Sequence, residues 1–260
     1  MSQVQLALHY REYGVKELPA LLLLHGLFGA SGNWQGVVKR LRGEFRLILP
    51  DLRNHGRSPH HEVMDYEAMA ADVLGLMDHL QLASVSLLGH SMGGKTAMWL
   101  ALSQPERVRR LVVADIAPVV YPNRFEEIFD GLLKLPLAHL QSRDAADRYL
   151  SHSVAERSVR QYLLQNLIRG DSGWSWRFSL PVLQGAMTQL AGFPEAREMS
   201  FAGRTLFIYG ERSDYLIPAY RGAIETYFPH ARLRVLDNAG HWLYAEQPEA
   251  FVRIVKGFLN

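Results

Sequence analysis

Ser91 lies at the centre of residues 89–93, which read Gly-His-Ser-Met-Gly and match the pattern G-x-S-x-G. This pattern exposes a serine hydroxyl for nucleophilic attack when it forms a sharp turn between a strand and a helix. An apolar run precedes the serine and a helical pattern follows it. The residues two before and two after the serine crowd each other in such a turn, so Gly89 and Gly93 suit those positions. A phosphate loop is disfavoured because the required glycine-lysine spacing is missing despite Lys95. The sequence indicates that Ser91 is a nucleophile.

His241 is the candidate general base. It follows an apolar strand pattern at 232–236 and precedes the last helical pattern at 248–259. Enzymes with this serine turn carry their histidine late in the chain, after the acid. A histidine there can take the serine proton and return it to a leaving group.

Two aspartates compete for the role of the acid that orients His241. Asp115 ends one predicted strand and Asp214 follows a later one. The acid often stands three residues after a glycine in the later loop, but Ser213 occupies that place after Gly210. Asp214 is one residue late, and it can instead cap the helix that follows. We favour Asp115, and Asp214 remains the alternative.

Two backbone N–H groups are expected to form an oxyanion hole. One belongs to Met92, directly after the serine, and the other to Leu27, in a glycine-containing loop after an early strand. N–H groups aimed at developing negative charge stabilise the transition state of acyl transfer. His25 opens the same loop, and we interpret its imidazole as a structural brace rather than a catalytic group.

A metal site is not expected. His55, His60 and His61 cluster near Asp51, but they lie on a turn without the helical i, i+4 spacing of many metal ligands. The chain contains no cysteine, which excludes disulfides, thiolate ligands and cysteine nucleophiles. No cofactor is expected either.

Short apolar runs alternate with helical patterns along most of the chain. Strands are predicted at 4–10, 20–24, 46–49, 85–88, 110–114, 204–209 and 232–236. Helices are predicted between them at 34–41, 66–80, 92–103, 218–228 and 248–259. This alternation predicts an α/β fold with a mainly parallel sheet flanked by helices.

Residues 118–198 break the alternation, because they contain helical patterns and loops without a convincing strand. The helical patterns lie at 125–133, 144–151, 156–167 and 181–190. An insertion directly after a strand end lies over the ligand crevice of an open α/β sheet. We therefore predict a helical lid at 118–198 on a core of 1–117 and 199–260. The aromatic candidates for lining its pocket, which could equally pack the lid onto the core, are Phe125, Trp174, Trp176 and Phe178.

The bulk properties limit the partners. A net charge of +2 is too small to indicate nucleic acid or an anionic membrane surface. The apolar runs are too short to span a bilayer, and residues 1–10 lack the pattern of a signal peptide. We expect a soluble, cytoplasmic protein that acts on a small molecule, with its oligomeric state open.

Taken together, these features resemble the small bacterial carboxylesterases of the YbfF type, within the α/β-hydrolase superfamily. The resemblance covers nearly the whole chain and rests on five segments, at 25–29, 51–58, 89–95, 115–119 and 239–242. Segment 51–58, with Asn54 in place of the commoner glycine, is more diagnostic than the serine turn. The resemblance implies an α/β-hydrolase fold whose helical lid shapes an acyl pocket. It also implies an acid at Asp115, with a serine where Ser213 stands.

The resemblance implies hydrolysis of carboxylic esters and thioesters, including acyl-CoA thioesters. The expected mechanism is two-step acyl transfer through an acyl-enzyme on Ser91, with His241 as base. A cofactor-free haloperoxidase and a carbon–carbon bond hydrolase share this triad and remain alternatives. A non-catalytic small-ligand receptor on the same fold is the alternative from another class. A haloalkane dehalogenase is disfavoured because its nucleophile would be an aspartate.

Overall fold

The structure is a computed structural model that describes residues 4–196, 198–216 and 218–260. Its centre is a seven-stranded sheet in the order β1-β3-β2-β4-β5-β8-β9. The strands are β1 (Tyr10–Tyr13), β2 (Ala20–Leu24), β3 (Arg46–Pro50), β4 (Val85–His90), β5 (Val108–Ala114), β8 (Arg204–Gly210) and β9 (Ala231–Leu236). All run parallel except β1, which pairs with β3 in the antiparallel sense. The predicted mainly parallel sheet is confirmed.

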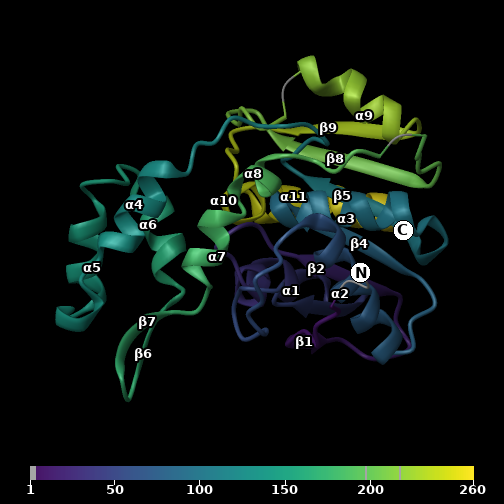
Figure 1. The fold of residues 1–260 in the computed structure, drawn as a ribbon. Helices are drawn as coiled ribbons and strands as arrows, with labels where there is room; N and C mark the ends of the chain where they lie inside the picture. The colour runs from purple at the N-terminus through teal and green to yellow at the C-terminus, as the bar shows by residue number, and fades with distance from the viewer. Residues whose placement is uncertain (1–3, 197, 217) are drawn as a thin grey trace.

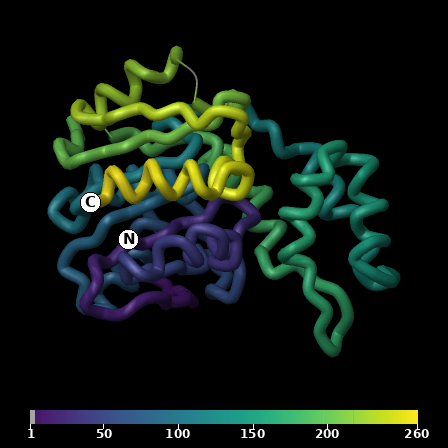
Figure 2. Tube along the Cα trace, turned by 180° about the vertical axis from the view of Figure 1, so that it is seen from behind, coloured from purple at the N-terminus to yellow at the C-terminus, as the bar shows by residue number. Residues whose placement is uncertain are grey.

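Helices cover both faces of this sheet (Figures 1 and 2). The core helices are α1 (Gln35–Leu41), α2 (Tyr66–His79), α3 (Met92–Ser103), α9 (Arg221–Tyr227), α10 (Leu243–Glu246) and α11 (Pro248–Leu259). Helices α1, α10 and α11 pack on one face, whereas α2, α3 and α9 pack on the other. Among the helices of the described ranges, none is long and apolar enough to cross a membrane.

Strand β2 is apolar throughout because both of its faces are buried. Leu22 and Leu24 point into the core beneath α2 and α3, whereas Leu21 and Leu23 point into the core beneath α1 and α11. All four side chains are fully buried. Successive side chains of a strand face opposite sides, so a strand covered on both faces needs an unbroken apolar run.

The first predicted strand is wrong in position. Residues 4–9 form no strand, and β1 begins only at Tyr10. Their backbone groups are satisfied by side chains instead, since the Leu6 N–H donates to Asp72 Oδ1 (2.6 Å) and the His9 N–H donates to Ser58 Oγ (2.9 Å). Residues 1–3, which entered the signal-peptide prediction, lie outside the described residues.

The region between β5 and β8 forms the predicted helical insert, which extends from one end of the sheet (Figure 1). Its helices are α4 (Glu126–Lys134), α5 (Arg143–Leu150), α6 (Arg157–Leu164), α7 (Leu180–Gly185) and α8 (Met187–Ala191). The prediction of a strand-free insert is wrong, because β6 (Leu167–Gly170) and β7 (Gly173–Trp176) form an antiparallel hairpin. The hairpin turns at residues 171–172, and Gly173 follows the turn with a φ of 105°, which favours glycine.

Candidate active site

Ser91 occupies a sharp turn between β4 and α3, with φ 53° and ψ −119°. This left-handed conformation costs a non-glycine residue free energy and is typical of functional sites. The flanking glycines make the turn possible. A Cβ on Gly89 would lie 2.2 Å from the Gly93 oxygen, and one on Gly93 would lie 2.3 Å from the Leu24 oxygen. Gly89 is therefore crowded by Gly93, as predicted, whereas Gly93 is crowded by the end of β2.

The loop after β9 brings His241 beside Asp115, which directly follows β5. The His241 Nδ1 lies 2.7 Å from Asp115 Oδ2, so the Nδ1–H tautomer donates to the carboxylate. The Asp115 side chain is fully buried, and the Gly210 N–H donates to its Oδ1 (3.0 Å). The Ser213 hydroxyl donates a further hydrogen bond to Oδ2. This tautomer leaves the other ring nitrogen of His241 unprotonated, as a base requires.

Asp214, unlike Asp115, makes its ion pair with an arginine rather than with His241. Its carboxylate forms an ion pair with Arg124 at the start of the insert, and both side chains are largely exposed. Within the described residues, the carboxylate that contacts His241 is that of Asp115. Ser91 and His241 face a common cleft, and the favoured acid contacts His241, while the alternative acid joins the β8 loop to the insert.

The loop at residues 25–29 is held by buried side chains. The His25 Nδ1 lies 2.9 Å from the Gly26 oxygen, and its Nε2 accepts from the Leu52 N–H (2.9 Å). The His55 Nε2 accepts from the N–H of Phe28, whose φ is 59°. Burial lowers the pKa of His25 and lowers that of His55 to about 3, so both rings stay neutral. The predicted brace is present, and His55 shares it.

The predicted oxyanion donors belong to two different elements, and both residues line the small cavity that also contains Ser91. Met92 begins α3 directly after the serine, and Leu27 lies within the braced loop. Among the hydrogen bonds of the described residues, neither N–H donates to another protein atom. The Leu27 carbonyl, in contrast, accepts from the Tyr162 hydroxyl of the insert (3.0 Å). Both N–H groups are thus available to a bound molecule.

The remaining histidines near Asp51 also contact the backbone. The His60 Nε2 lies 3.1 Å from the Arg177 oxygen, and the His61 Nδ1 accepts from the Val63 N–H. The described residues contain no group of three or more histidine, cysteine, aspartate or glutamate side chains that could hold a metal.

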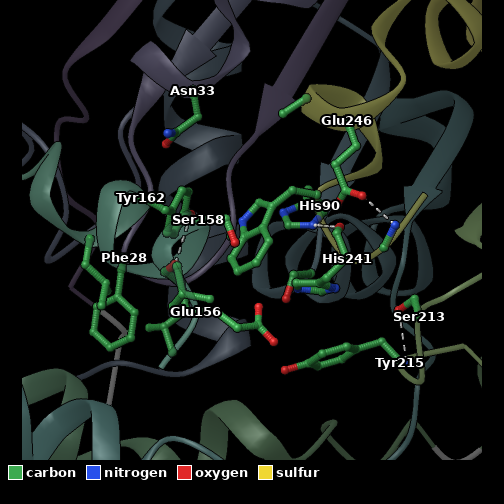
Figure 3. A pocket seen from close by; sticks show the side chains of 18 of the residues that line it. Phe28, Asn33, His90, Glu156, Ser158, Tyr162, Ser213, Tyr215, His241 and Glu246 are labelled. Carbon is green, nitrogen blue, oxygen red and sulfur yellow. Dashed lines mark hydrogen bonds between the residues drawn. The ribbon is translucent and has the colours of Figure 1, made fainter. Parts of the chain in front are cut away.

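His90 and Tyr215 flank His241, and the sequence analysis missed both (Figure 3). The Tyr215 ring stacks on the imidazole with a centroid distance of 4.0 Å and an interplanar angle of 23°. The His90 ring lies 4.6 Å away, and its Nε2–H donates to the His241 oxygen (2.9 Å). Burial lowers the pKa of His90 well below its ordinary value, so this neighbour stays neutral. The position of His90 beside Ser91 was an available signal, whereas nothing local marks Tyr215.

Two cavities meet at Ser91. A cleft of about 1080 Å³ lies between the core and the insert, and Ser91 and His241 both line it. A narrower, mostly apolar chamber of about 40 Å³ also reaches Ser91, and Met92, Ile116 and Met187 line it. The nucleophile candidate therefore stands at the junction of a wide space and a narrow one.

Of the four aromatic residues proposed to line the pocket, Phe125 lies at both cavities. Trp174, Trp176 and Phe178 line neither. Phe178 instead stacks on Trp176 (5.2 Å, 11°) and contacts Phe28 of the core (5.1 Å). The packing interpretation therefore holds for these three. Phe178 joins the insert to the core, whereas Trp174 and Trp176 pack, partly buried, against the same hydrophobic cluster.

The model of the alpha/beta hydrolase fold family matches residues 19–248. The chain belongs to the α/β-hydrolase family. This hydrolase is 41% identical to the mouse sn-1-specific diacylglycerol lipase ABHD11, over 95% of the chain and 82% of the relative. It is 36% identical to the esterase YbfF of Escherichia coli, over 92% of both proteins. The predicted resemblance to YbfF-type esterases is thereby confirmed.

A solved structure of a marine microorganism esterase superposes on the hydrolase with a TM-score of 0.95. The two proteins are 33% identical, and the match covers 98% of this chain and 100% of the other. Within its family, the hydrolase is therefore a carboxylic ester hydrolase of the esterase and lipase group.

Proposed function

We propose that this esterase works by two-step acyl transfer on Ser91, with His241 as base and Asp115 as the orienting acid. In the first step, His241 takes the Ser91 proton while the hydroxyl oxygen attacks the ester carbonyl. The N–H groups of Leu27 and Met92 stabilise the resulting oxyanion. His241 then gives its proton to the leaving alcohol or thiol. Water, deprotonated by His241, releases the acid from the acyl-enzyme.

The contact between His241 Nδ1 and Asp115 Oδ2 carries this proposal. A buried carboxylate is stable only when hydrogen bonds and a charge partner satisfy it. Asp115 has two donors besides the imidazole, from Gly210 and Ser213. It can therefore hold the histidine tautomer and stabilise the imidazolium that forms during proton transfer.

We further propose that the acyl group enters the narrow chamber and that the leaving group occupies the cleft. The cleft matches the upper end of the range for small-molecule sites, about 300–1,000 Å³. It has room for a long or branched leaving group, such as a glyceride or the CoA part of a thioester. The diacylglycerol lipase and esterase names of the relatives support lipid-like esters as substrates. Residues 118–198 would act as the cap over a core of 1–117 and 199–260.

A fluorophosphonate probe tests the nucleophile. The wild-type protein is expected to bind the probe covalently at Ser91, with parallel loss of ester hydrolysis, and Ser91→Ala is expected to show neither property. Ser158→Ala, which changes another serine of the cleft, serves as the matched control and should remain reactive. An unlabelled wild type that still hydrolyses esters contradicts the proposal. Comparing p-nitrophenyl esters with acyl-CoA thioesters then ranks the leaving groups.

A further inference from the structure

Lys95 follows Ser91 by one helical turn of α3, and its side chain is buried, with 1% of the residue exposed. Its ammonium donates to three backbone oxygens, those of Val119 (2.9 Å), Ala191 (2.8 Å) and Gly192 (2.5 Å). An ammonium has three N–H donors, so the three carbonyls satisfy it completely. Buried lysines are rare and usually paired, so a lysine held by carbonyls alone requires a structural reason.

The three carbonyls belong to the two ends of the insert. Val119 lies where the chain leaves the sheet after β5, whereas Ala191 and Gly192 lie where it returns towards β8. These two segments, which we call the stem of the insert, also contact each other directly, because the Tyr121 N–H donates to the Ala191 oxygen (2.9 Å). One side chain on the nucleophile helix therefore holds both halves of the stem.

Two tyrosines complete the surroundings of the ammonium. Its nitrogen lies 4.8 Å from the ring centroid of Tyr121 and 5.8 Å from that of Tyr66 on α2. Both distances allow a cation–π attraction. The Tyr66 hydroxyl donates to the Leu190 oxygen (2.6 Å), which adds a second anchor for the returning half of the stem.

The same residues form the wall of the narrow chamber beside Ser91. Lys95, Tyr66, Tyr121 and Leu190 all line it, together with the nucleophile. Lys95 therefore holds the stem, and the stem in turn forms a wall of the space for an acyl group. A shift of the stem away from α3 would enlarge the chamber without moving Ser91.

We propose that Lys95 is a positioning residue that fixes both halves of the insert stem to the nucleophile helix and thereby limits the length of the acyl group that the chamber accepts. This inference rests on the proposed acyl-enzyme at Ser91. One methylene in a hydrophobic pocket changes specificity by about 10–200-fold, so a small movement of the stem is measurable as a change in acyl selectivity.

Protonation of Lys95 should modulate this contact. Burial lowers the pKa of its ammonium to about 7. The titratable groups that face it are Tyr66 and Tyr121, whose pKa values are raised by burial, so both phenols stay neutral. Among the ion pairs of the described residues, none joins Lys95 to a carboxylate. The neutral amine keeps two donors for three carbonyls, so the stem loses one hydrogen bond as the pH rises through about 7.

Lys95→Met tests the inference on a series of p-nitrophenyl esters from acetate to octanoate. The ratio of kcat/KM for octanoate to that for acetate is expected to rise at least about tenfold, the scale of one methylene. The change should appear mainly in the KM of the long ester, with fluorophosphonate labelling of Ser91 retained. Lys134→Met is the matched control, because Lys134 is exposed and pairs with Asp130 on α4. Its ratio should equal that of the wild type.

Two further measurements test the inference even if Lys95→Met fails to fold. Tyr66→Phe removes only the bond to the Leu190 oxygen and should change the ratio in the same direction by a smaller factor. In the wild type, the same ratio should rise between about pH 6 and 8, on either side of the Lys95 pKa. A pH effect on the proton-transfer steps that both esters share cancels in this ratio.

The outcomes separate the two proposals. A normally labelled Lys95→Met protein that loses activity equally on all chain lengths, or wild-type and Tyr66→Phe ratios that do not move, would overturn the role of Lys95 alone. A wild type that hydrolyses esters without labelling at Ser91 would instead overturn the proposed function.

Discussion

The loops that follow β5 and β8 leave neighbouring parallel strands at the same edge of the sheet, and each carries an aspartate. Asp115 is fully buried and accepts hydrogen bonds from Ser213, Gly210 and His241. The Asp214 side chain is 62% exposed and contacts Arg124. Chain position alone would favour the later loop, so burial and donors distinguish the two aspartates where sequence order does not.

The two loops also depend on each other. The β5 loop supplies the buried charge, whereas the β8 loop supplies two of the donors that make its burial tolerable. Hydrogen bonds to a charged group are worth about 1.5–3 kcal/mol, whereas an exposed ion pair is worth about 0.2–1 kcal/mol. An esterase site assembled this way should therefore be sensitive to changes around Asp115 and tolerant of changes at Asp214.

The largest effect is expected from Asp115→Asn. An amide at this position favours the wrong histidine tautomer and cannot stabilise the imidazolium, so kcat should fall by about 10⁴-fold. Steady-state hydrolysis of p-nitrophenyl acetate measures the change, with circular dichroism to confirm folding. Asp214→Asn is the matched control. A comparable fall only in the control variant would reverse the assignment of the acid.

Ser213→Ala should have the next largest effect. It removes one donor from Asp115 Oδ2 while leaving the contact of that oxygen with His241. The loss of a hydrogen bond to a charged group predicts a decrease in kcat of about tenfold or more. Ser158→Ala in the same cleft provides the control. If Ser213→Ala keeps full activity, the cooperation between the two loops is refuted.

Tyr215→Leu should have a smaller effect, because it removes a ring that stacks on His241 without touching the acid. An aromatic pair is worth about 0.5–1.5 kcal/mol, which corresponds to about a two- to tenfold decrease in kcat/KM. Tyr215→Phe keeps the ring and should restore most of the activity. Equal losses in both variants would show that the hydroxyl, rather than stacking, matters.

The smallest effect is expected from Arg124→Met, which breaks the exposed ion pair with Asp214. The free energy of unfolding should change by less than about 1 kcal/mol, because water and salt screen such pairs. Chemical denaturation measures this quantity. Arg124 also lines both cavities, and its guanidinium carbon lies 5.9 Å from the Tyr215 ring centroid, so activity on short esters should fall by less than in Tyr215→Leu. A large loss of activity would assign the pair a role in the site.

Most of the central sheet could be predicted from the sequence. Periodicity located its parallel strands and the helices between them, because strands buried on both faces need apolar runs such as that of β2. The edge strand β1 and the hairpin of β6 and β7 were missed. Residues 4–9 bond to the side chains of Asp72 and Ser58, and these partners are distant in the sequence.

Part of the candidate site could likewise be predicted from the sequence, and part could not. The position of Ser91 and the two glycines around it follow from local sterics, since any Cβ on Gly89 or Gly93 would overlap backbone atoms. His241 follows from its place after the last strand. His90 is adjacent to the serine, yet the residue that it contacts, His241, lies 151 residues away in the sequence. No local pattern predicts that contact.

The sequence by itself determined the serine turn at Ser91, the late loop that carries His241 and the sheet that positions both, because those features depend on neighbouring residues and on strand periodicity. Tertiary structure decided the rest. Only the packing of the β5 and β8 loops buries Asp115 among donors and leaves Asp214 exposed. Only the folding of the insert brings its two ends to Lys95. Burial and hydrogen bonds to distant residues set the free energy of placing a charged group in the interior. Both arise only when segments far apart in the sequence come into contact.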